Sequence, residues 1–233
     1  MNSNGQDVHG QAILDYHLGM QRGPLIVYNS YGAPEKMPIE VFFRGEDDFT
    51  DLESYAISLA AGKVLDVGAG AGAVSLYIQE TGGDCTGLDY SPGCVKVMED
   101  KGLKKVVHGD IFTYGSEKFD TIMLLMNGIG LAGTVKNLEV LLETLEKLLF
   151  PGGQLLFDSS DVSYLKPQGN RIYNYIGEVR YQYAYAGVKG EWFDWLYIEQ
   201  EILMDTCHKM GLPVQVVFED DTGQYLARVL GRN

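Results

Sequence analysis

The segment VLDVGAGAGAVSLYI, residues 64–78, constrains the fold more than any other part of the chain. A short apolar run leads directly into three alternate glycines, Gly68, Gly70 and Gly72, and a helix-forming run follows them. A glycine-rich turn between a strand and a helix lets a ligand approach the backbone closely, and in open α/β folds such turns lie at the carboxyl edge of the sheet. We therefore expect a ligand-binding α/β protein built around this turn.

Strand-like and helix-like runs alternate after Lys63, which predicts a parallel sheet covered by helices on both faces. Ser91 and Pro92 are suited to begin one of these helices, and Gly102 to end it. A last pair of strand-like runs in residues 213–232 predicts a closing antiparallel hairpin. The other predicted strands cover residues 63–67, 84–89, 104–110, 118–127 and 153–160.

The 233 residues contain no repeat and no long polar tract, which predicts a single domain over residues 1–233. Within it we expect four parts. These are an N-terminal helical extension or cap (1–62), a ligand-binding core (63–160), an aromatic β-rich insertion (161–198), and a helix plus closing hairpin (199–233).

Composition excludes several classes of partner. The formal net charge of −14 would repel a polyanion, so we expect no nucleic acid. No uncharged apolar run approaches the roughly 20 residues of a membrane helix, and the N-terminus lacks a signal-peptide pattern, so we expect a cytoplasmic protein with no membrane partner. Cys85, Cys94 and Cys207 are widely spaced, which favours buried thiols over disulfides and predicts no metal site.

The glycine turn alone fits both a dinucleotide and an adenosine-based sulfonium cofactor, and the acidic residues near it distinguish the two. Gly68, Gly70 and Ala73 formally satisfy a dinucleotide fingerprint. However, Asp66 would repel a pyrophosphate and attract a cationic ligand. Asp89 ends the second strand, where a carboxylate can accept both ribose hydroxyls in either class. With Asp110 after the third strand, placed to accept from an adenine amine, the pattern suits an adenosine that carries an amino acid and a sulfonium.

On VLDVGAGAG, GLDYSP, HGDIF, FDTIMLLMN and PGG, the chain resembles the class I S-adenosylmethionine-dependent methyltransferases over about residues 60–160. The resemblance implies S-adenosylmethionine as cofactor and a doubly wound, Rossmann-like, mostly parallel seven-stranded sheet with a C-terminal antiparallel hairpin. It implies that the glycine turn lies close to the methionine moiety of the cofactor and that Asp66 lies beneath this moiety. It also implies that Asp89 binds the ribose hydroxyls. The other donor-site residues that it implies are Gly68, Ala69, Gly70, Tyr90, Asp110, Ile111, Met126 and Asn127.

The segment MNGIG after the fourth strand departs from the Asn/Asp-Pro-Pro-aromatic motif of relatives that methylate nucleobase amino groups. This departure and the acidic charge favour a small-molecule acceptor. Alignment of the reactants can lower the barrier by about 7–11 kcal/mol, whereas a general base supplies roughly 3–5 kcal/mol, so a base is optional. Asn127 and His17 are the candidates for a direct catalytic role. An NAD(P)-dependent oxidoreductase and a non-catalytic S-adenosylmethionine-binding protein remain as alternatives.

Two further hypotheses concern segments outside the core. The guanidinium of Arg44 suits the donor carboxylate, although a surface pairing with Glu46 or Asp47 explains it equally well. Residues 14–44 and 159–198 would together roof the acceptor site, or else form a subunit interface. We expect the protein to be a monomer or a homodimer. The substrate-binding candidates in and beside these segments are Tyr16, Tyr31, Asp158, Tyr164, Trp192 and Trp195.

Overall fold

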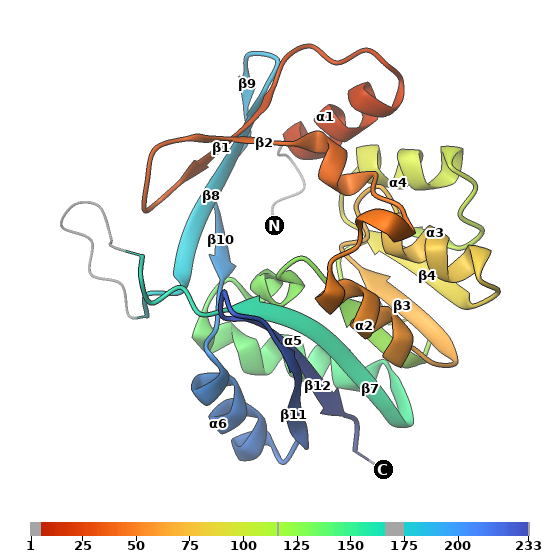
Figure 1. Ribbon diagram of the computed structural model, residues 1–233, viewed down its shortest axis with the longest axis vertical. Coiled ribbons are helices and arrows are strands. Elements are labelled where there is room, and N and C mark those ends of the chain that lie inside the picture. The colour runs from red at the N-terminus through yellow and green to blue at the C-terminus, as the bar shows by residue number, and fades with distance from the viewer. Residues whose placement is uncertain (1–5, 116, 166–174, 233) are drawn as a thin grey trace.

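A seven-stranded sheet forms the centre of the molecule in the computed structural model, which describes residues 6–115, 117–165 and 175–232 (Figure 1). The strand order is β11-β12-β7-β6-β3-β4-β5, in which only β12 runs antiparallel to its neighbours. This confirms the predicted fold class. The bounds are β3 Lys63–Val67, β4 Asp84–Asp89, β5 Val106–His108, β6 Phe119–Leu124, β7 Leu149–Ser160, β11 Val214–Glu219 and β12 Gln224–Leu230.

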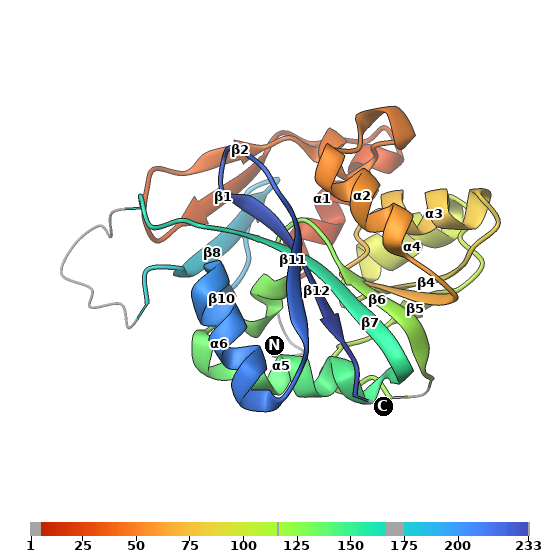
Figure 2. The ribbon, with the colours of Figure 1, turned by 60° about the horizontal axis from the view of Figure 1, so that its bottom comes forward.

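Helices cover both faces of this sheet (Figure 2). On one face, α5 (Val135–Lys147) and α6 (Gln200–Met210) pack on a core that includes Ile122 and Leu124 of β6. On the other, α2 (Asp51–Leu59) and α3 (Ala73–Glu80) pack against Met123 and its neighbours. The alternation of β6 between two buried faces explains why its sequence is almost continuously apolar.

Local signals set most element bounds in the core. Helix α4 (Pro92–Asp100) begins at Ser91, whose Oγ accepts from the Cys94 N–H at 3.0 Å, with Pro92 in the first turn as predicted. Strand β7 differs, because it begins at Leu149 and continues through the predicted break at 151–153. A register irregularity in the β6–β7 pairing accommodates the extra residues there.

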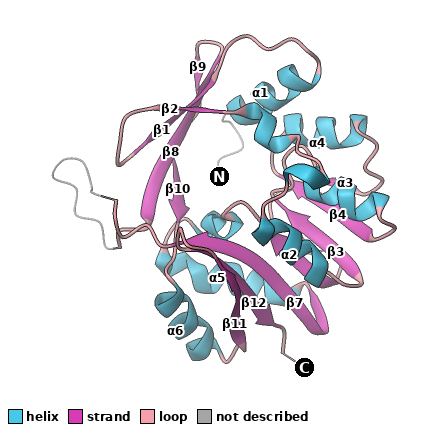
Figure 3. Cartoon of the chain, in the orientation of Figure 1, coloured by secondary structure: helices cyan, strands magenta, loops and turns pink. Residues whose placement is uncertain are grey.

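A second sheet unites the two segments that flank the core (Figure 3). The N-terminal extension is not purely helical, since LIVYN at residues 25–29 is rich in β-branched and aromatic residues and pairs with the insertion. The strand order is β10-β8-β1-β2, with β9 paired to β8. The remaining elements are α1 Val8–His17, β1 Leu25–Asn29, β2 Glu35–Met37, η1 Ile39–Phe42, η2 Glu46–Asp48, η3 Gly128–Ala132, β8 Glu178–Tyr185, β9 Val188–Lys189 and β10 Phe193–Leu196.

The environment of the cysteines and the length and apolarity of the helices bear on two predictions from the sequence. Cys85, Cys94 and Cys207 are free and buried. In the part of the chain that the structure describes, no helix has the length and apolarity needed to cross a bilayer.

Candidate active site

The glycine turn between β3 and α3 has a left-handed backbone at all three glycines, with φ of +72° at Gly68, +59° at Gly70 and +78° at Gly72. Side chains are disfavoured by this backbone, which accounts for glycine at each position. A Cβ built on Gly68 would meet no atom within 4 Å, and one on Gly70 would lie 3.6 Å from Phe42. The backbone at Gly68 is therefore open to a ligand, and Phe42 of η1 packs beside it.

Asp89 at the end of β4 is tied directly to the glycine turn. Its Oδ2 accepts from the Gly70 N–H and its Oδ1 from the Ser91 N–H, both at 2.8 Å. Burial raises the pKa of Asp89 to about 6 in spite of these hydrogen bonds. Each carboxylate oxygen has a second lone pair, so this side chain can still accept from a pair of ligand hydroxyls.

Asp66 lies beneath the turn, where β3 packs under α3. It is 5% exposed, and its Oδ2 accepts from the Ser75 hydroxyl at 2.6 Å. Burial raises the pKa of Asp66 to about 6, and the Ser75 hydrogen bonds oppose that rise. The residue thus joins the strand to the helix on the two sides of the turn, and an approaching cation would stabilise its ionised form.

Asp110 follows β5 at the same edge of the sheet. Its Oδ1 accepts from the Phe112 N–H at 3.0 Å, which forms a local turn after the strand. Ile111 points into the core at 4% exposure, whereas Tyr90 after β4 is 43% exposed. The His108 Nε2 lies 3.0 Å from the Tyr90 carbonyl and holds the loops after β4 and β5 together.

Asn127 is bound within the protein on both sides of its amide. Its Nδ2 donates to the Leu196 carbonyl at 3.1 Å and its Oδ1 accepts from the Ser159 hydroxyl at 3.0 Å. Its φ of +58° follows the +59° of Met126, a pair of left-handed non-glycine residues that a strained loop after β6 accommodates. Met126 is 46% exposed, so it and not the Asn127 side chain projects from this loop.

Asp158 at the end of β7 secures that strained loop. Both of its carboxylate oxygens accept from the Asn127 N–H at 2.9 Å, and Oδ2 also accepts from the Gln224 amide at 2.9 Å. The side chain is 1% exposed, and burial raises its pKa to about 6. Asp158 therefore connects the ends of β6, β7 and β12, and its hydrogen-bonding capacity is largely used by the protein.

The rings of Tyr16 and His17 lie at the end of α1, against Phe43. The Tyr16 and Phe43 centroids are 4.9 Å apart, and His17 stacks on Phe43 at 6.4 Å. The His17 Nε2 is 3.8 Å from Asp100 at the end of α4. These contacts place His17 with α4, and they do not bring it to Asn127.

Arg44 pairs with neither Glu46 nor Asp47, the two surface partners considered in the sequence analysis. Its Nη1 and Nη2 donate to the two oxygens of Glu53 at 2.9 and 2.6 Å, and its Nε donates to the Val41 carbonyl at 2.7 Å. Glu53 is 4% exposed and also completes the capping box of α2 with Thr50. Three of the five guanidinium N–H groups are used in this way, and two remain for a ligand.

Aromatic rings of the second sheet form a continuous wall, which we define as Tyr181, Tyr183, Phe193 and Trp195. The Phe193 centroid lies 6.1 Å from Tyr181, 5.3 Å from Tyr183 and 6.1 Å from Trp195. Trp195 packs so closely on Gly130 of η3 that a Cβ there would overlap its indole. The wall is thereby fixed against the loop that carries Asn127.

A chain of hydroxyls runs beside the wall. The Tyr181 hydroxyl is 3.0 Å from those of Tyr31 and Tyr197. Tyr31 and Trp195 are thus brought together with the second sheet, whereas Tyr164 is 73% exposed and Trp192, 39% exposed, lies beside Arg180. Phe193 and Tyr197 were not predicted from the sequence. The β8–β10 register places Phe193 opposite Tyr181, and Tyr197 directly follows β10.

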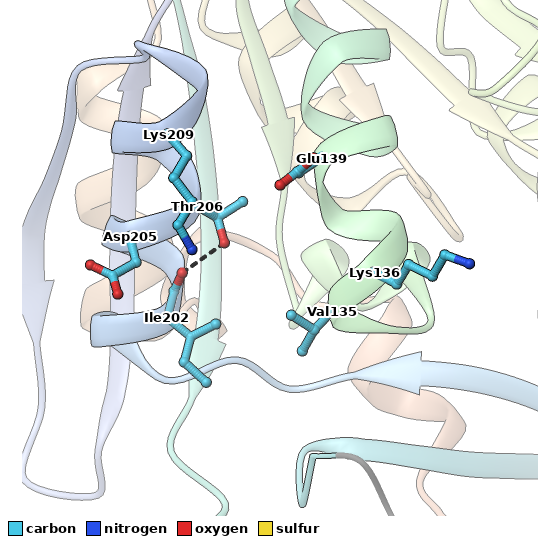
Figure 4. A pocket seen from close by; sticks show the side chains of 7 residues that line it. All are labelled: Val135, Lys136, Glu139, Ile202, Asp205, Thr206 and Lys209. Atoms are coloured by element: carbon cyan, nitrogen blue, oxygen red, sulfur yellow. Dashed lines mark hydrogen bonds between the residues drawn. The ribbon is translucent and has the colours of Figure 1, made fainter.

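A cleft of about 410 Å³ lies elsewhere, between α5 and α6 (Figure 4). None of its lining residues was a predicted site residue, and both helices cover a face of the main sheet. The cleft is therefore separate from the glycine turn. It is lined by Val135, Lys136, Glu139, Ile202, Asp205, Thr206 and Lys209. Over the described residues, no group of three or more His, Cys, Asp or Glu side chains is arranged to hold a metal ion.

Comparisons with known proteins agree with this arrangement. A family model described as a methyltransferase domain matches residues 47–205. An S-adenosylmethionine-dependent methyltransferase from Bacteroides fragilis, solved in complex with S-adenosyl-L-homocysteine, is 32% identical, with a TM-score of 0.90 over 100% of both chains. A sugar N-methyltransferase from Streptoalloteichus sp. ATCC 53650 shares the fold, with a TM-score of 0.59, 18% identity and coverage of 87% of this chain and 96% of that one.

Among curated proteins, two demethylmenaquinone methyltransferases of Tropheryma whipplei, strains Twist and TW08/27, are 29% identical over 103 residues. That match covers 42% of this chain and 41% of the length of each relative.

The fold and the strand-end site therefore define a methyltransferase domain. The chain belongs to the class I S-adenosylmethionine-dependent methyltransferases. The family, the enzyme class and the cofactor predicted from the sequence motifs are thus confirmed, whereas the roles of individual residues stay predictions.

Proposed function

We propose that this protein transfers the methyl group of S-adenosylmethionine to a small-molecule acceptor that lies between the glycine turn and the aromatic wall. The observation that carries the proposal is the Asp89 carboxylate, half-buried at the end of β4 and hydrogen-bonded to the Gly70 N–H of an open glycine turn. Such a carboxylate suits ribose hydroxyls, and the open backbone at Gly68 suits the methionine moiety.

The residues present fit the donor in chemical type. Asp89 would hold the ribose hydroxyls, Asp66 would face the cationic amino-acid portion from beneath the turn, and Asp110 would meet the adenine amine. Arg44 would offer its two remaining N–H groups to the donor carboxylate. The remaining proposed donor contacts are Gly68, Ala69, Gly70, Tyr90, Ile111 and Met126.

When bound, S-adenosylmethionine supplies a methyl carbon on a positively charged sulfur. On transfer, the acceptor would bond to this carbon as the carbon–sulfur bond broke, the electron pair of that bond would stay on sulfur, and the proton of the acceptor would pass to solvent. The protein has to align the acceptor and exclude water, and alignment lowers the barrier by about 7–11 kcal/mol. The aromatic wall would serve both needs, because its rings offer flat apolar contact beside the hydroxyls of Tyr31, Tyr181 and Tyr197.

Several observations support a small molecule over a macromolecule. The net charge of −14 disfavours nucleic acid. The relatives named above include a sugar N-methyltransferase and demethylmenaquinone methyltransferases, whose names point to small acceptors. We propose that the protein works as a monomer or homodimer with neither nucleic acid nor membrane as partner.

Calorimetry with S-adenosyl-L-homocysteine and with NADH tests the donor half. We expect binding of the first and none of the second, and the reverse would overturn the proposal in favour of an oxidoreductase. Turnover of labelled S-adenosylmethionine with a panel of phenols, amines, thiols and amino sugars tests the acceptor half. Donor binding without transfer to any member of a broad panel would favour a non-catalytic binding protein.

A further inference from the structure

His9 lies in the first turn of α1, and its imidazole is held between aromatic rings. It stacks on Tyr183 of the aromatic wall with centroids 4.8 Å apart, and it meets the Phe42 ring edge-on at 5.0 Å. Phe42 is the residue that packs beside Gly70 in the glycine turn. His9 therefore lies between the wall and the turn.

The anchoring of α1 ties this position to the donor side of the site. Asp7 caps α1 by accepting from the Gly10 N–H at 2.8 Å, and its other oxygen accepts from the Ser91 hydroxyl at 2.7 Å and the Gly93 N–H at 3.0 Å. Ser91 in turn donates its N–H to Asp89. Asp7 and Ser91 therefore link the first turn of α1 by hydrogen bonds to the proposed ribose-binding carboxylate of Asp89.

The Nε2 of His9 is buried and has no hydrogen-bond partner within the described residues. A buried polar atom without a partner is unfavourable, so its retention favours a partner from outside the described residues, such as a bound ligand. Burial lowers the pKa of His9 to about 4, with nearby Asp7 acting in the opposite direction. The imidazole is therefore neutral at physiological pH, and one of its two nitrogens is a hydrogen-bond acceptor.

We propose that the Nε2 of His9 accepts a hydrogen bond from the nucleophilic O–H or N–H of the methyl acceptor, and so turns the lone pair of that group toward the donor. The inference rests on the proposed function. It narrows the acceptor to a molecule that carries a hydroxyl or amino nucleophile on a flat or apolar body, because the rings of Tyr183 and Phe42 flank the imidazole.

Matched small probes test this role without knowledge of the natural acceptor. With S-adenosyl-L-homocysteine at saturation, phenol and aniline can donate to Nε2, whereas toluene of similar size cannot. One hydrogen bond is worth about 1 kcal/mol, so we expect phenol to bind the wild type about fivefold to tenfold more tightly than toluene. The ¹⁵N resonance of the His9 Nε2 should also move with phenol and stay with toluene. Comparison of phenol with aniline then distinguishes hydroxyl from amino acceptors.

His9→Phe retains a ring for stacking and removes the acceptor atom, so it should abolish the preference for phenol. His9→Gln restores an acceptor near the same place and should recover part of it, and His208→Phe removes an exposed imidazole on α6 as a control. Equal affinities for phenol and toluene in the wild type, absence of phenol binding, or a preference that survives in His9→Phe would overturn the role of His9. Loss of S-adenosyl-L-homocysteine binding in the wild type would instead defeat the proposed function.

Discussion

Three carboxylates, Asp66 in β3, Asp89 at the end of β4 and Asp158 near the end of β7, have pKa values raised to about 6. Their shared cause is desolvation, which the hydrogen bonds that each receives only partly offset. Two of them are proposed donor contacts, whereas Asp158 secures the loop after β6. The donor site is therefore expected to change its charge just below neutral pH.

Donor binding should consequently depend on pH. Ribose hydroxyls and the donor amino group both favour the ionised form of a carboxylate, so binding lowers the pKa of Asp66 and Asp89 and releases protons. A group with a pKa of about 6 is only about one-tenth ionised at pH 5, so affinity should fall about tenfold per participating carboxylate between pH 7.5 and pH 5. Calorimetry in buffers of different ionisation enthalpy measures the released protons. Affinity that is flat over this interval would contradict the proposed contacts.

Strand β4 offers a matched pair of variants for testing the role of Asp89. Asp89→Ala removes a charge-assisted pair of hydrogen bonds, each worth about 1.5–3 kcal/mol, so affinity for S-adenosyl-L-homocysteine should fall at least tenfold. Asp84→Ala at the start of β4 removes an exposed carboxylate that pairs with Lys105, and it should leave affinity unchanged. Unchanged binding by a folded Asp89→Ala protein would remove this residue from the site.

At the scale of single residues, the sequence was informative where a residue lies at or just after the end of a strand. Asp89 and Asp110 were readable because the carboxyl ends of neighbouring parallel strands share one edge. The partners of Arg44 and Asn127 were not readable, since Glu53 and Leu196 approach them only through tertiary packing. An internally bound Asn127 also makes its predicted direct role in catalysis harder to support, and that role stays an untested prediction.

At the scale of elements, Arg44 joins η1 to α2, because its Nε donates to Val41 of η1 and its Nη1 and Nη2 donate to Glu53 of α2. Arg44→Ala leaves the Glu53 carboxylate buried without its partner, which should destabilise the protein by about 3 kcal/mol. Glu53→Gln in the same chain removes the stranded charge and should recover part of that loss. Thermal unfolding of the single and double variants measures both effects.

Donor affinity in those variants separates structure from binding. If Arg44 also contacts the donor carboxylate, Arg44→Ala/Glu53→Gln should bind S-adenosyl-L-homocysteine more weakly than Glu53→Gln alone. Equal affinities of these two variants would assign Arg44 to the ion pair only.

For the molecule as a whole, the second sheet combines residues from before and after the core, and its aromatic wall lies beside the loop after β6. If this sheet roofs the acceptor site, S-adenosyl-L-homocysteine should slow hydrogen exchange in β1 and in β8 together, at constant mass. Mass photometry or light scattering monitors the oligomer alongside. Protection that follows protein concentration and not donor would assign the wall to a subunit interface.

The main sheet was predictable because each of its parallel strands is signalled by local sequence, and right-handed connections leave few arrangements open. The second sheet was not, although alternation in residues 178–196 was visible. Pairing of β1 with β8 brings Asn29 beside Tyr181, and no local pattern specifies a partner at that separation. This is why the residues of the proposed donor site could be predicted from the sequence and those of the proposed acceptor site could not.

The pairing of β1 with β8 also determines the order in which the two sheets fold during synthesis of the chain. Strand β1 leaves the ribosome early and pairs with β2, which follows it directly, yet its other edge finds a partner only when β8 emerges. The strands of the donor core lie between them and all but the closing hairpin are complete by then. Since distant pairings form slowly and exposed strand edges invite aggregation, the nascent protein holds a nearly finished donor core while the β1–β2 pair still exposes the edge of β1 that binds β8. Chaperone demand should therefore peak just before residues 178–196 are made.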